Sequence, residues 1–381
     1  MFVPHAGRRY AAGRNTDGGA GNHTQVSVLS PFIRHRTIAE SEVVAAVLAS
    51  HSPSAAEKFL QEVCWRTYWK GWLEQRPTIW RDYQRTVTDA HDTLSAAQRD
   101  DYAAAITGKT GLECFDAWAN ELIETGYLHN HARMWFASIW IFTLRLPWAL
   151  GAAFFMRHLF DGDAASNTLS WRWVGGLQTR GKTYLARPDN IARFTEGRFG
   201  PVRGLADVAE PLPWVEPPSP RREFVVTPIQ KGLRSGLLVT DDDLSPWPAL
   251  AGEPVVTAAL LGSADGVADN VREFVTALSA DSAASIEQRL GVAVQAVGDV
   301  DSVVAWAVAE RLQQVIMPYT PVGRAADCLD GVVERLAEHD VHLANPLRRW
   351  DEAAWPHATR GFFPFRKIIP DLLVLASADP T

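Results

Sequence analysis

The hydrophobic pattern of this 381-residue chain changes its period part of the way along. Between Ser41 and Arg198 apolar residues recur at helical spacing, and almost no stretch alternates with period two. Beyond residue 234 short apolar runs alternate with helical ones, a rhythm typical of βαβ units and a largely parallel sheet. A single uniform architecture is therefore excluded, and we expect a multidomain protein with an α part and an α/β part.

Three parts are predicted: an all-helical domain over 1–200, a proline-rich linker over 201–234, and a Rossmann-like α/β domain over 235–381. In the helical part we expect helices over 41–49, 54–75 and 111–126, and a buried helical stretch over 134–155. In the α/β part we expect strands over 235–243, 253–262, 293–299 and 341–344 and helices over 266–280, 303–314 and 325–339.

The composition narrows the class of protein. With 47% hydrophobic and 21% charged residues, it is that of a globular protein in water. No uninterrupted apolar stretch approaches the roughly 18 residues of a membrane span, and three widely spaced cysteines form neither a disulfide framework nor a zinc pattern. We expect a cytoplasmic monomer without a membrane partner or a metal site.

Charge is distributed unevenly along the chain. The first 200 residues hold 22 Lys and Arg against 19 Asp and Glu, a balance of +3, which leaves 15 against 25, or −10, for the rest. This balance argues against indiscriminate coating of DNA, but the first part can still carry a basic face.

Candidate site residues cluster in three places. Hydroxyls of Ser27 and Ser30 lie in the polar segment 22–33, where they could hold a phosphate or simply cap a helix. The segment "FLQEVCWRTYWKGW" puts an acid, a base and indoles on adjoining helical faces, and an ordinary amphipathic helix would explain it as well.

The third cluster combines "HNHARM" with "DGDAASNTLSWRW". Asn130 and Arg133 are one helical turn apart, so both can face one cavity. Arg133 lies in an apolar helix, and buried charges need partners, which Asp161 or Asp163 could supply. A purely structural Arg–Asp bridge is the alternative.

Together these segments resemble the flavin domain of the DNA photolyase and cryptochrome family. The matching motifs are "SVLSP", "QEVCWR", "GKTG", "HNHARM" and "DGDAASNTLSWRW", in the family's order over roughly residues 10–200. The resemblance implies FAD bound within an all-helical domain, with an antenna chromophore that stays unknown. To the FAD it assigns Tyr10, Ser27, Leu29, Ser30, Arg66, Arg133, Asp161, Asp163 and Asn167.

The resemblance also implies roles within that site. Arg133 and Asp161 would pair beside the isoalloxazine, Asp163 would lie near its pyrimidine edge, and Asn167 would face flavin N5, which goes with a repair-competent flavin. Trp171 and Trp148 match the inner and middle members of an electron-transfer chain. The outer member is missing near Ser95, and Trp118, Tyr102 or Tyr83 are the candidates to replace it.

The family's pocket for a flipped cyclobutane pyrimidine dimer is matched by Glu62, Trp65, Asn130, Met134 and Trp173. The resemblance therefore implies blue-light repair of pyrimidine dimers in DNA, that is, a lyase activity. Exposed phosphates beside the lesion could meet the basic residues that follow Trp173, which are Arg180, Lys182, Arg187 and Arg193.

Domain order departs from the family pattern, which puts the α/β domain first. Segments "LLVTDDDLSPWPAL" and "NPLRRW" to "GFFPFRKI" resemble parts of that domain, so a circular permutant is expected. An unrelated α/β module is the alternative. Two other functions stay open: a cryptochrome-like photoreceptor or signalling flavoprotein without repair activity, and a non-catalytic relic of the fold.

Overall fold

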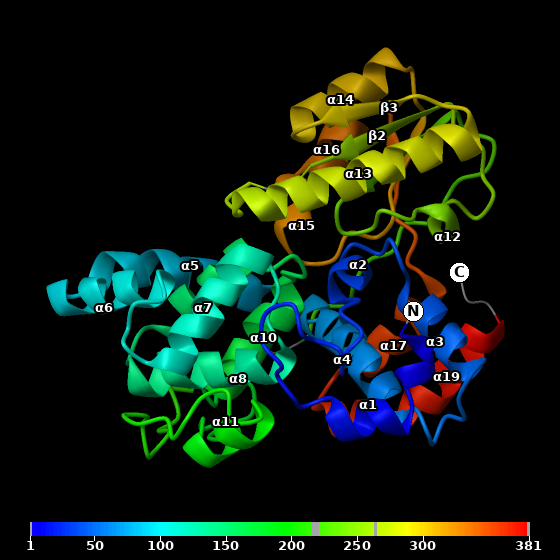
Figure 1. The fold of residues 1–381 in the computed structure, drawn as a ribbon. Helices are drawn as coiled ribbons and strands as arrows, with labels where there is room; N and C mark the ends of the chain where they lie inside the picture. Colours follow the sequence, from blue (N-terminus) through cyan, green and yellow to red (C-terminus); the bar gives the residue numbers. More distant parts are fainter. Residues whose placement is uncertain (1, 215–220, 263–264, 379–381) are drawn as a thin grey trace. The chain divides into compact units, whose positions relative to one another are not determined.

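A computed structural model describes residues 2–214, 221–262 and 265–378 (Figure 1). The predicted linker therefore lies partly outside the described residues, which resume at Arg221. The chain forms two compact units: the first comprises residues 1–30, 50–62 and 76–220, and the second comprises 31–49, 63–75 and 221–381. The bounds of these units differ from the predicted domain boundaries at residues 200 and 234. The predicted domains stay a prediction.

The first unit is helical, as its apolar spacing predicts. Between α8 (Asn130–Ser138) and α9 (Trp148–His158) the chain makes a π-helical turn, Ile139–Thr143. It then turns again at Arg145, whose φ is +55°. The stretch expected as one buried helix over 134–155 is therefore two helices. The helices are α1 (Arg8–Gly13), α5 (Thr78–Thr93), α6 (Ala96–Ile106), α7 (Glu113–Thr125), α8 (Asn130–Ser138), α9 (Trp148–His158), α10 (Ala164–Val174) and α11 (Pro188–Phe194).

Local signals explain several ends of these helices. Ser95 caps α6, since its Oγ accepts from the Gln98 backbone at 3.2 Å. Helix α7 ends at Gly126, whose φ of +66° suits the left-handed residue that closes many helices. The core of the unit is aromatic, and its largest fully buried side chains include Trp118, Trp135 and Trp140.

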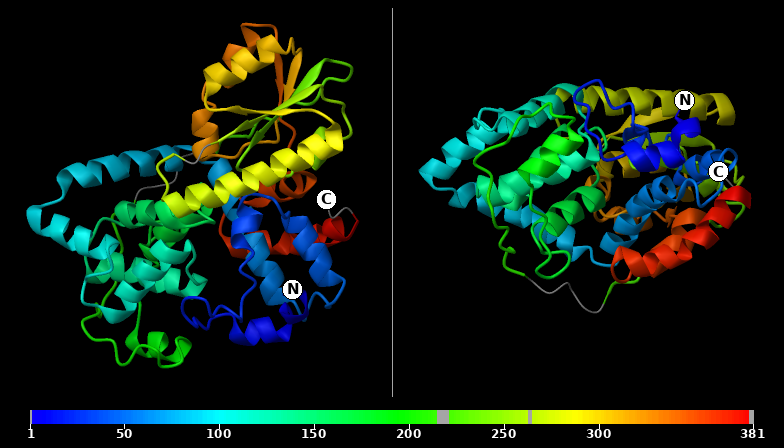
Figure 2. Two further views of the ribbon diagram at one scale, coloured as in Figure 1. Left: turned by 45° about the horizontal axis from the view of Figure 1, so that its top comes forward. Right: turned by 60° about the horizontal axis from the view of Figure 1, so that its bottom comes forward.

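The second unit contains a five-stranded, all-parallel sheet in the order β3-β2-β1-β4-β5 (Figures 1 and 2). All six residues of central β1 are buried, as expected for a parallel sheet covered on both faces. The strands are β1 (Ser235–Thr240), β2 (Thr257–Leu261), β3 (Val294–Val297), β4 (Gln314–Ile316) and β5 (His342–Ala344).

Helices cover both faces of this sheet. Leu238 and Val315 face one core, with Val303 and Leu336 of the covering helices α14 and α16. Leu237 and Ile316 face the other core, with Ile286 of α13. Figure 2 shows α13 lying along its own face of the sheet. The sheet's helices are α12 (Trp247–Leu250), α13 (Asp269–Leu290), α14 (Val300–Ala309), α15 (Arg324–Cys328) and α16 (Val332–Ala337).

The rest of the second unit is helical. Within it α3 packs against α19. Helix α4 begins in the first unit and ends in the second, and α2 begins at the last residue of a first-unit segment. These helices are α2 (Ser30–Arg34), α3 (Glu40–Leu48), α4 (Glu57–Glu74), α17 (Arg349–Ala354), α18 (Phe362–Phe365) and α19 (Ile369–Ala378).

The predicted fold class is confirmed: a helical part and a parallel α/β part are both present. Two of the helices expected in the α/β part were wrong. Residues 303–314 were expected to be one helix, but α14 ends at Ala309 and Gln314 begins β4. Residues 325–339 were also expected to be one helix, but Gly331, at a φ of +78°, separates α15 from α16.

Buried ion pairs gather at the carboxyl end of β1. Arg348 donates to Asp243 through Nε at 2.7 Å and through a terminal nitrogen at 2.6 Å. Arg36 contacts the same carboxylate and donates to buried Asp351. These arginines hold the pKa of Asp243 below its usual range, although burial acts in the opposite direction.

Replacing Asp243 by asparagine should destabilise the protein strongly. The Asp243→Asn variant keeps the shape but leaves Arg348 and Arg36 short of a counter-charge, a loss of about 3–5 kcal/mol for a buried pair. Because the folded pKa is depressed, this contribution is present above the unfolded pKa of an aspartate and is lost as the pH falls through the folded value. Urea unfolding across pH measures both effects.

The matched control is Asp269→Asn. Asp269 pairs with Arg272 at 2.9 Å, but the pair is exposed, and such pairs contribute little. Equal losses in the two variants would contradict the role given to the buried pairs.

Candidate functional site

Arg133 and Asp161 form an ion pair in the first unit. A terminal nitrogen of Arg133 donates to Asp161 Oδ2 at 3.0 Å, and its other terminal nitrogen lies 3.0 Å from Oδ1. Arg133 Nε donates to the Leu128 carbonyl at 2.8 Å, which orients the guanidinium. Asp161 is buried and Arg133 is half-buried, so the arginine keeps part of its side chain available. This is the Arg–Asp pair that the sequence predicts, whereas its role beside a flavin stays a prediction.

Helix α10 carries the next group of predicted residues. Asp163 caps the helix, accepting from the Ser166 backbone at 3.0 Å and the Ala165 backbone at 3.4 Å. One turn in, the Asn167 amide nitrogen donates to the Ala152 carbonyl at 2.8 Å. That bond fixes the rotation of the amide and turns Oδ1 away from Ala152. Among the described residues no donor is assigned to this oxygen, so it can accept from a ligand.

The N-terminal segment of the first unit contains the predicted phosphate and ribose contacts. Tyr10 is buried edge-on against Phe59, with ring centroids 5.1 Å apart, and burial raises its pKa. Ser27, Leu29 and Ser30 are half-buried, and Ser27 Oγ accepts from the Leu29 backbone at 3.4 Å. Between them Val28 has a φ of +53°, a strained conformation for a β-branched residue.

Glu62 forms an ion pair with Arg14, a residue that the sequence analysis missed. Both side chains are about one third exposed. Burial raises the pKa of Glu62, and Arg14 opposes that rise. Arg14 follows Tyr10 by four residues, so the spacing of one helical turn was the signal that could have identified it.

The other predicted lesion contacts of the first unit lie on two helices that pack together, α8 and α10. Asn130 is exposed at the start of α8, and Met134, one turn later, is half-buried. Trp173 on α10 is half-buried, and its ring lies 5.7 Å from that of Tyr184. Each side chain is therefore accessible to a ligand at least in part.

Trp65 and Arg66 belong to the second unit. Both are half-buried. The Trp65 ring is stacked on Phe362 of α18, with centroids 3.7 Å apart and planes 10° apart. One face of the indole that was expected to meet a lesion is therefore covered, a contact that no sequence pattern indicated.

The two tryptophans of the predicted electron-transfer chain have different surroundings in the first unit. Trp171 is buried, and its ring lies 5.1 Å from Phe155 and 6.1 Å from Trp140. Trp148 is half-buried, with its ring 5.7 Å from that of Tyr83. Within the described residues no ring contact joins Trp148 to Trp171.

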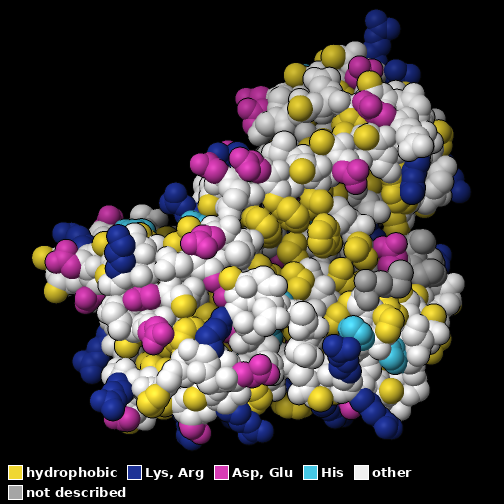
Figure 3. Space-filling view, viewed as in Figure 1, with side chains coloured by type: hydrophobic (Ala, Val, Ile, Leu, Met, Phe, Trp, Pro, Cys, Tyr) yellow, Lys and Arg dark blue, Asp and Glu magenta, His cyan; other side chains and the backbone are white. Residues whose placement is uncertain are grey.

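Basic residues follow Trp173 on the surface of the first unit. The four predicted phosphate contacts are all exposed: Arg180, Lys182, Arg187 and Arg193. Figure 3 shows Lys and Arg side chains, with a few acidic ones among them, over α11 and the neighbouring loops. Such a surface suits a polyanion.

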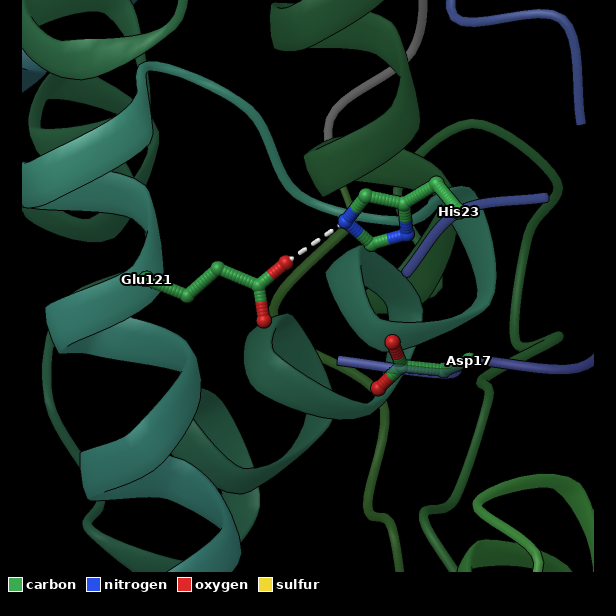
Figure 4. A group of neighbouring side chains, drawn as sticks. All are labelled: Asp17, His23 and Glu121. Carbon is green, nitrogen blue, oxygen red and sulfur yellow. Dashed lines mark hydrogen bonds and ion pairs between the residues drawn. The ribbon is translucent and has the colours of Figure 1, made fainter. Parts of the chain in front are cut away.

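A second polar cluster in the first unit was not predicted. Asp17, His23 and Glu121 offer ligand atoms within 4.8 Å of one another, a set that could hold a metal ion (Figure 4). Hydrogen bonds already engage it: His23 Nε2 pairs with Glu121 at 2.8 Å, while Asp17 accepts from Trp118 at 2.9 Å and Arg198 at 2.5 Å. Arg198 already supplies a positive charge to Asp17. Through these hydrogen bonds and ion pairs, the cluster holds the N-terminal loop against α7.

Two histidines at the start of α8 are held by the protein itself. His129 is buried, and its Nδ1 accepts from the His131 backbone at 3.2 Å. His131 contacts the Asn15 carbonyl at 3.1 Å and the Tyr184 hydroxyl at 3.2 Å. Burial lowers the pKa of His129 to about 4 and also lowers that of His131.

Comparison with known proteins identifies the helical part. A model of the FAD binding domain of DNA photolyase matches residues 59–197. A deoxyribodipyrimidine photo-lyase of Streptomyces griseus is 33% identical over an alignment of 178 residues, and the match covers 43% of this chain and 38% of that protein. The same enzyme of Alkalihalophilus pseudofirmus is 29% identical over 164 residues, 42% of this chain and 34% of that protein.

Among solved structures, a bacterial class III photolyase from Agrobacterium tumefaciens is similar over 51% of this chain and 40% of that one, with 25% identity and a TM-score of 0.40. The family-model match and the sequence relatives confirm the predicted resemblance of the helical part to the flavin domain of the photolyase and cryptochrome family. The chain spans less than half the length of these relatives. None of the helices among the described residues is long and apolar enough to cross a membrane.

His129 should make the protein less stable in acid. Its folded pKa of about 4 lies below the ordinary 6.5, so between these values the unfolded chain binds more protons and the free energy of unfolding falls as the pH is lowered. The whole effect is about 3 kcal/mol. His129→Asn keeps a side chain that can cap α8 and removes the titration, so urea unfolding between pH 7 and 4 should show a shallower decline.

The matched control is His339→Asn, because His339 is exposed. This variant should keep the decline seen in the unaltered protein. An unchanged decline in His129→Asn would show that the burial of His129 is not its cause.

Proposed function

We propose that this protein binds FAD in its helical part and uses blue light to repair cyclobutane pyrimidine dimers in DNA. The match to the FAD binding domain of DNA photolyase supports the cofactor, and relatives named deoxyribodipyrimidine photo-lyase support the reaction class. When bound, FAD would supply light absorption and electron transfer. The rest depends on how this chain's own residues hold the cofactor and the lesion.

Asn167 is the observation that carries the proposal. Its side chain is 7% exposed, and its amide nitrogen is occupied by the Ala152 carbonyl. The carbonyl oxygen Oδ1 is thereby the end available to a ligand, and it can only accept. A reduced flavin carries a proton on N5, so this fixed acceptor suits the reduced form while adding no charge.

The residues present around α8 and α10 fit a flavin. The half-buried Arg133 is held by Asp161 and by the Leu128 carbonyl, so its positive charge is oriented before any ligand arrives. The strained backbone at Val28 lies between the hydroxyls of Ser27 and Ser30, which could bind phosphate or ribose oxygens. Eight of the nine residues assigned to FAD belong to the first unit, and Arg66 is the exception.

The lesion would be bound through one stacking surface and several polar groups. A pyrimidine dimer has lost normal stacking, which lowers the cost of flipping it out of the duplex. Trp173 offers an indole face, while Asn130 and the Arg14–Glu62 pair offer donors and acceptors to base edges. The exposed basic residues 180–193 would bind flanking phosphates, so binding should weaken with salt.

A cryptochrome-like photoreceptor without repair is the second candidate, and one observation favours it. The Trp65 ring, expected to face the lesion, is stacked on Phe362 within the second unit. A receptor needs flavin photochemistry but no open stacking surface for a base. Circular permutation, the predicted domains and a cytoplasmic monomer remain part of the proposal, and the antenna chromophore is left unassigned.

Light-dependent repair decides between these functions. We expect purified protein with reduced flavin to remove dimers from an oligonucleotide under blue light and not in darkness. Trp173→Ala should weaken binding of the dimer about 5- to 150-fold, because base–aromatic stacking contributes about 1–3 kcal/mol. Its FAD content, read from the absorption spectrum, should stay unchanged.

Trp247→Ala is the matched control, since Trp247 is a half-buried indole of the second unit that lies beneath Arg289. It should repair normally. Photochemistry of bound flavin without any loss of dimer would refute repair and support the photoreceptor.

A further inference from the structure

We propose that Tyr184, held in place by His131, is a positioning residue that fixes the Trp173 ring for stacking on a flipped base. The inference rests on the proposed function, because Trp173 is the indole that would meet the dimer. Tyr184 and His131 are half-buried residues of the first unit. The sequence assigns neither of them to the site, and their role follows from contacts between segments that are distant along the chain.

The Tyr184 ring packs beside the Trp173 ring. Their centroids are 5.7 Å apart and their planes meet at 31°, within the range of distances at which aromatic pairs attract each other. Among the described residues no other ring contacts Trp173. Trp173 is half-buried, so part of the indole stays available to a ligand. Tyr184 is therefore the ring against which this indole is held.

Backbone contacts keep Tyr184 beside the helix that carries Trp173. The Tyr184 amide donates to the Val174 carbonyl at 3.1 Å. Just before it, an antiparallel bridge pairs Thr183 with Gly175, the residue that follows α10. The chain thus leaves the helix, turns back on the end of it and places the Tyr184 ring next to that of Trp173.

The Tyr184 hydroxyl is fixed by the imidazole of His131. His131 Nδ1 lies 3.1 Å from the Asn15 carbonyl, which can only accept, so Nδ1 carries a proton. Burial lowers the pKa of His131, so the ring is neutral at pH 7 and Nε2 keeps its lone pair. The Tyr184 hydroxyl, 3.2 Å from Nε2, therefore donates to it. This bond ties the far end of the Tyr184 ring to α8.

His131 is itself held by the core of the first unit. Its ring is stacked on that of fully buried Trp135, with centroids 4.1 Å apart and planes 25° apart. The Trp135 indole nitrogen donates in turn to Asn190 at 3.0 Å. The hydroxyl of Tyr184 is thus anchored to packed, hydrogen-bonded side chains.

The same contacts connect Trp173 to the polar groups expected at the base edges. His131 follows Asn130 on α8, and its partner Asn15 follows Arg14. The stacking surface and these polar groups are therefore joined by one set of contacts within the first unit. A site that is ordered before its ligand arrives loses less conformational entropy on binding. Binding of a dimer should thus depend on Tyr184 even without a contact between Tyr184 and the base.

Fluorine NMR tests the positioning without DNA. Protein labelled with 5-fluorotryptophan should give a Trp173 resonance, identified by its loss in Trp173→Phe. Tyr184→Phe removes the hydroxyl and keeps the ring, so this resonance should shift or broaden as the indole becomes mobile. His131→Phe keeps a ring beside Trp135 but removes the acceptor, and it should have the same effect. A Trp173 resonance that is unchanged in both variants would overturn the inference.

Affinity for a dimer-containing oligonucleotide tests what the positioning achieves. Tyr184→Phe should weaken binding about 2- to 10-fold, the effect of losing one neutral hydrogen bond, while the FAD content stays unchanged. In a Trp173→Ala background the same change should have no further effect, because the indole that it positions is gone. A merely structural role of the hydroxyl would instead weaken both proteins equally.

Tyr319→Phe is the matched control, because the Tyr319 hydroxyl donates to Glu74 at 2.7 Å within the second unit. This variant should bind dimers like the unaltered protein. Equal losses from Tyr184→Phe with and without Trp173 would overturn the inference and leave the proposed function intact. Unaltered protein that binds no dimer would overturn both, so its own affinity separates the two cases.

Discussion

The second unit depends on contacts between two short charged segments that are far apart in sequence, residues 34–36 and residues 241–243. Arg34 pairs with Asp242, Arg36 with Asp243, and His35 Nδ1 contacts the Asp241 carbonyl at 2.6 Å. Removing charges from water costs several kcal/mol per ion, so the carboxylates of Asp242 and Asp243 at the end of a buried strand require these arginines. Segment 31–49 is therefore as much a part of this unit as the strands are, and a division of the chain at residue 200 or 234 would separate the partners.

In the first unit, helix α10 determines the positions of several candidate site residues. Asp163 fixes the start of the helix, and the spacing along it then determines which side chains share a face. Asn167 and Trp171 are four residues apart and lie one turn from each other, whereas Trp173 follows Trp171 by two and points elsewhere. The structure shows this division: Trp171 is buried against Trp140, and Trp173 is half-buried near Tyr184. One cap thus orients Asn167 and Trp171 on one side of the helix and Trp173 on another.

Local patterns predicted local structure well. The helices expected over 41–49, 54–75 and 111–126 appear as α3, α4 and α7 within three residues at either end. Strand β4 was missed because it begins at Gln314, which looks polar in sequence. In the fold Gln314 is fully buried, and its amide donates to the Gln230 carbonyl and to Ser235. The Arg14–Glu62 pair and the Trp65–Phe362 stack likewise depend on residues distant in sequence, which no local pattern can bring together.

The tryptophans of the first unit show why composition alone could not assign them roles. Buried indole N–H groups normally find acceptors, as those of Trp118 and Trp135 do with Asp17 and Asn190. Trp171 is equally buried but has no acceptor among the described residues, and such a group costs about 1–3 kcal/mol. Packing does not require that cost, since a phenylalanine would fill similar space without it. Trp355 of the second unit is also buried, and its indole nitrogen also has no acceptor among the described residues, so an unsatisfied nitrogen alone assigns a role to neither tryptophan.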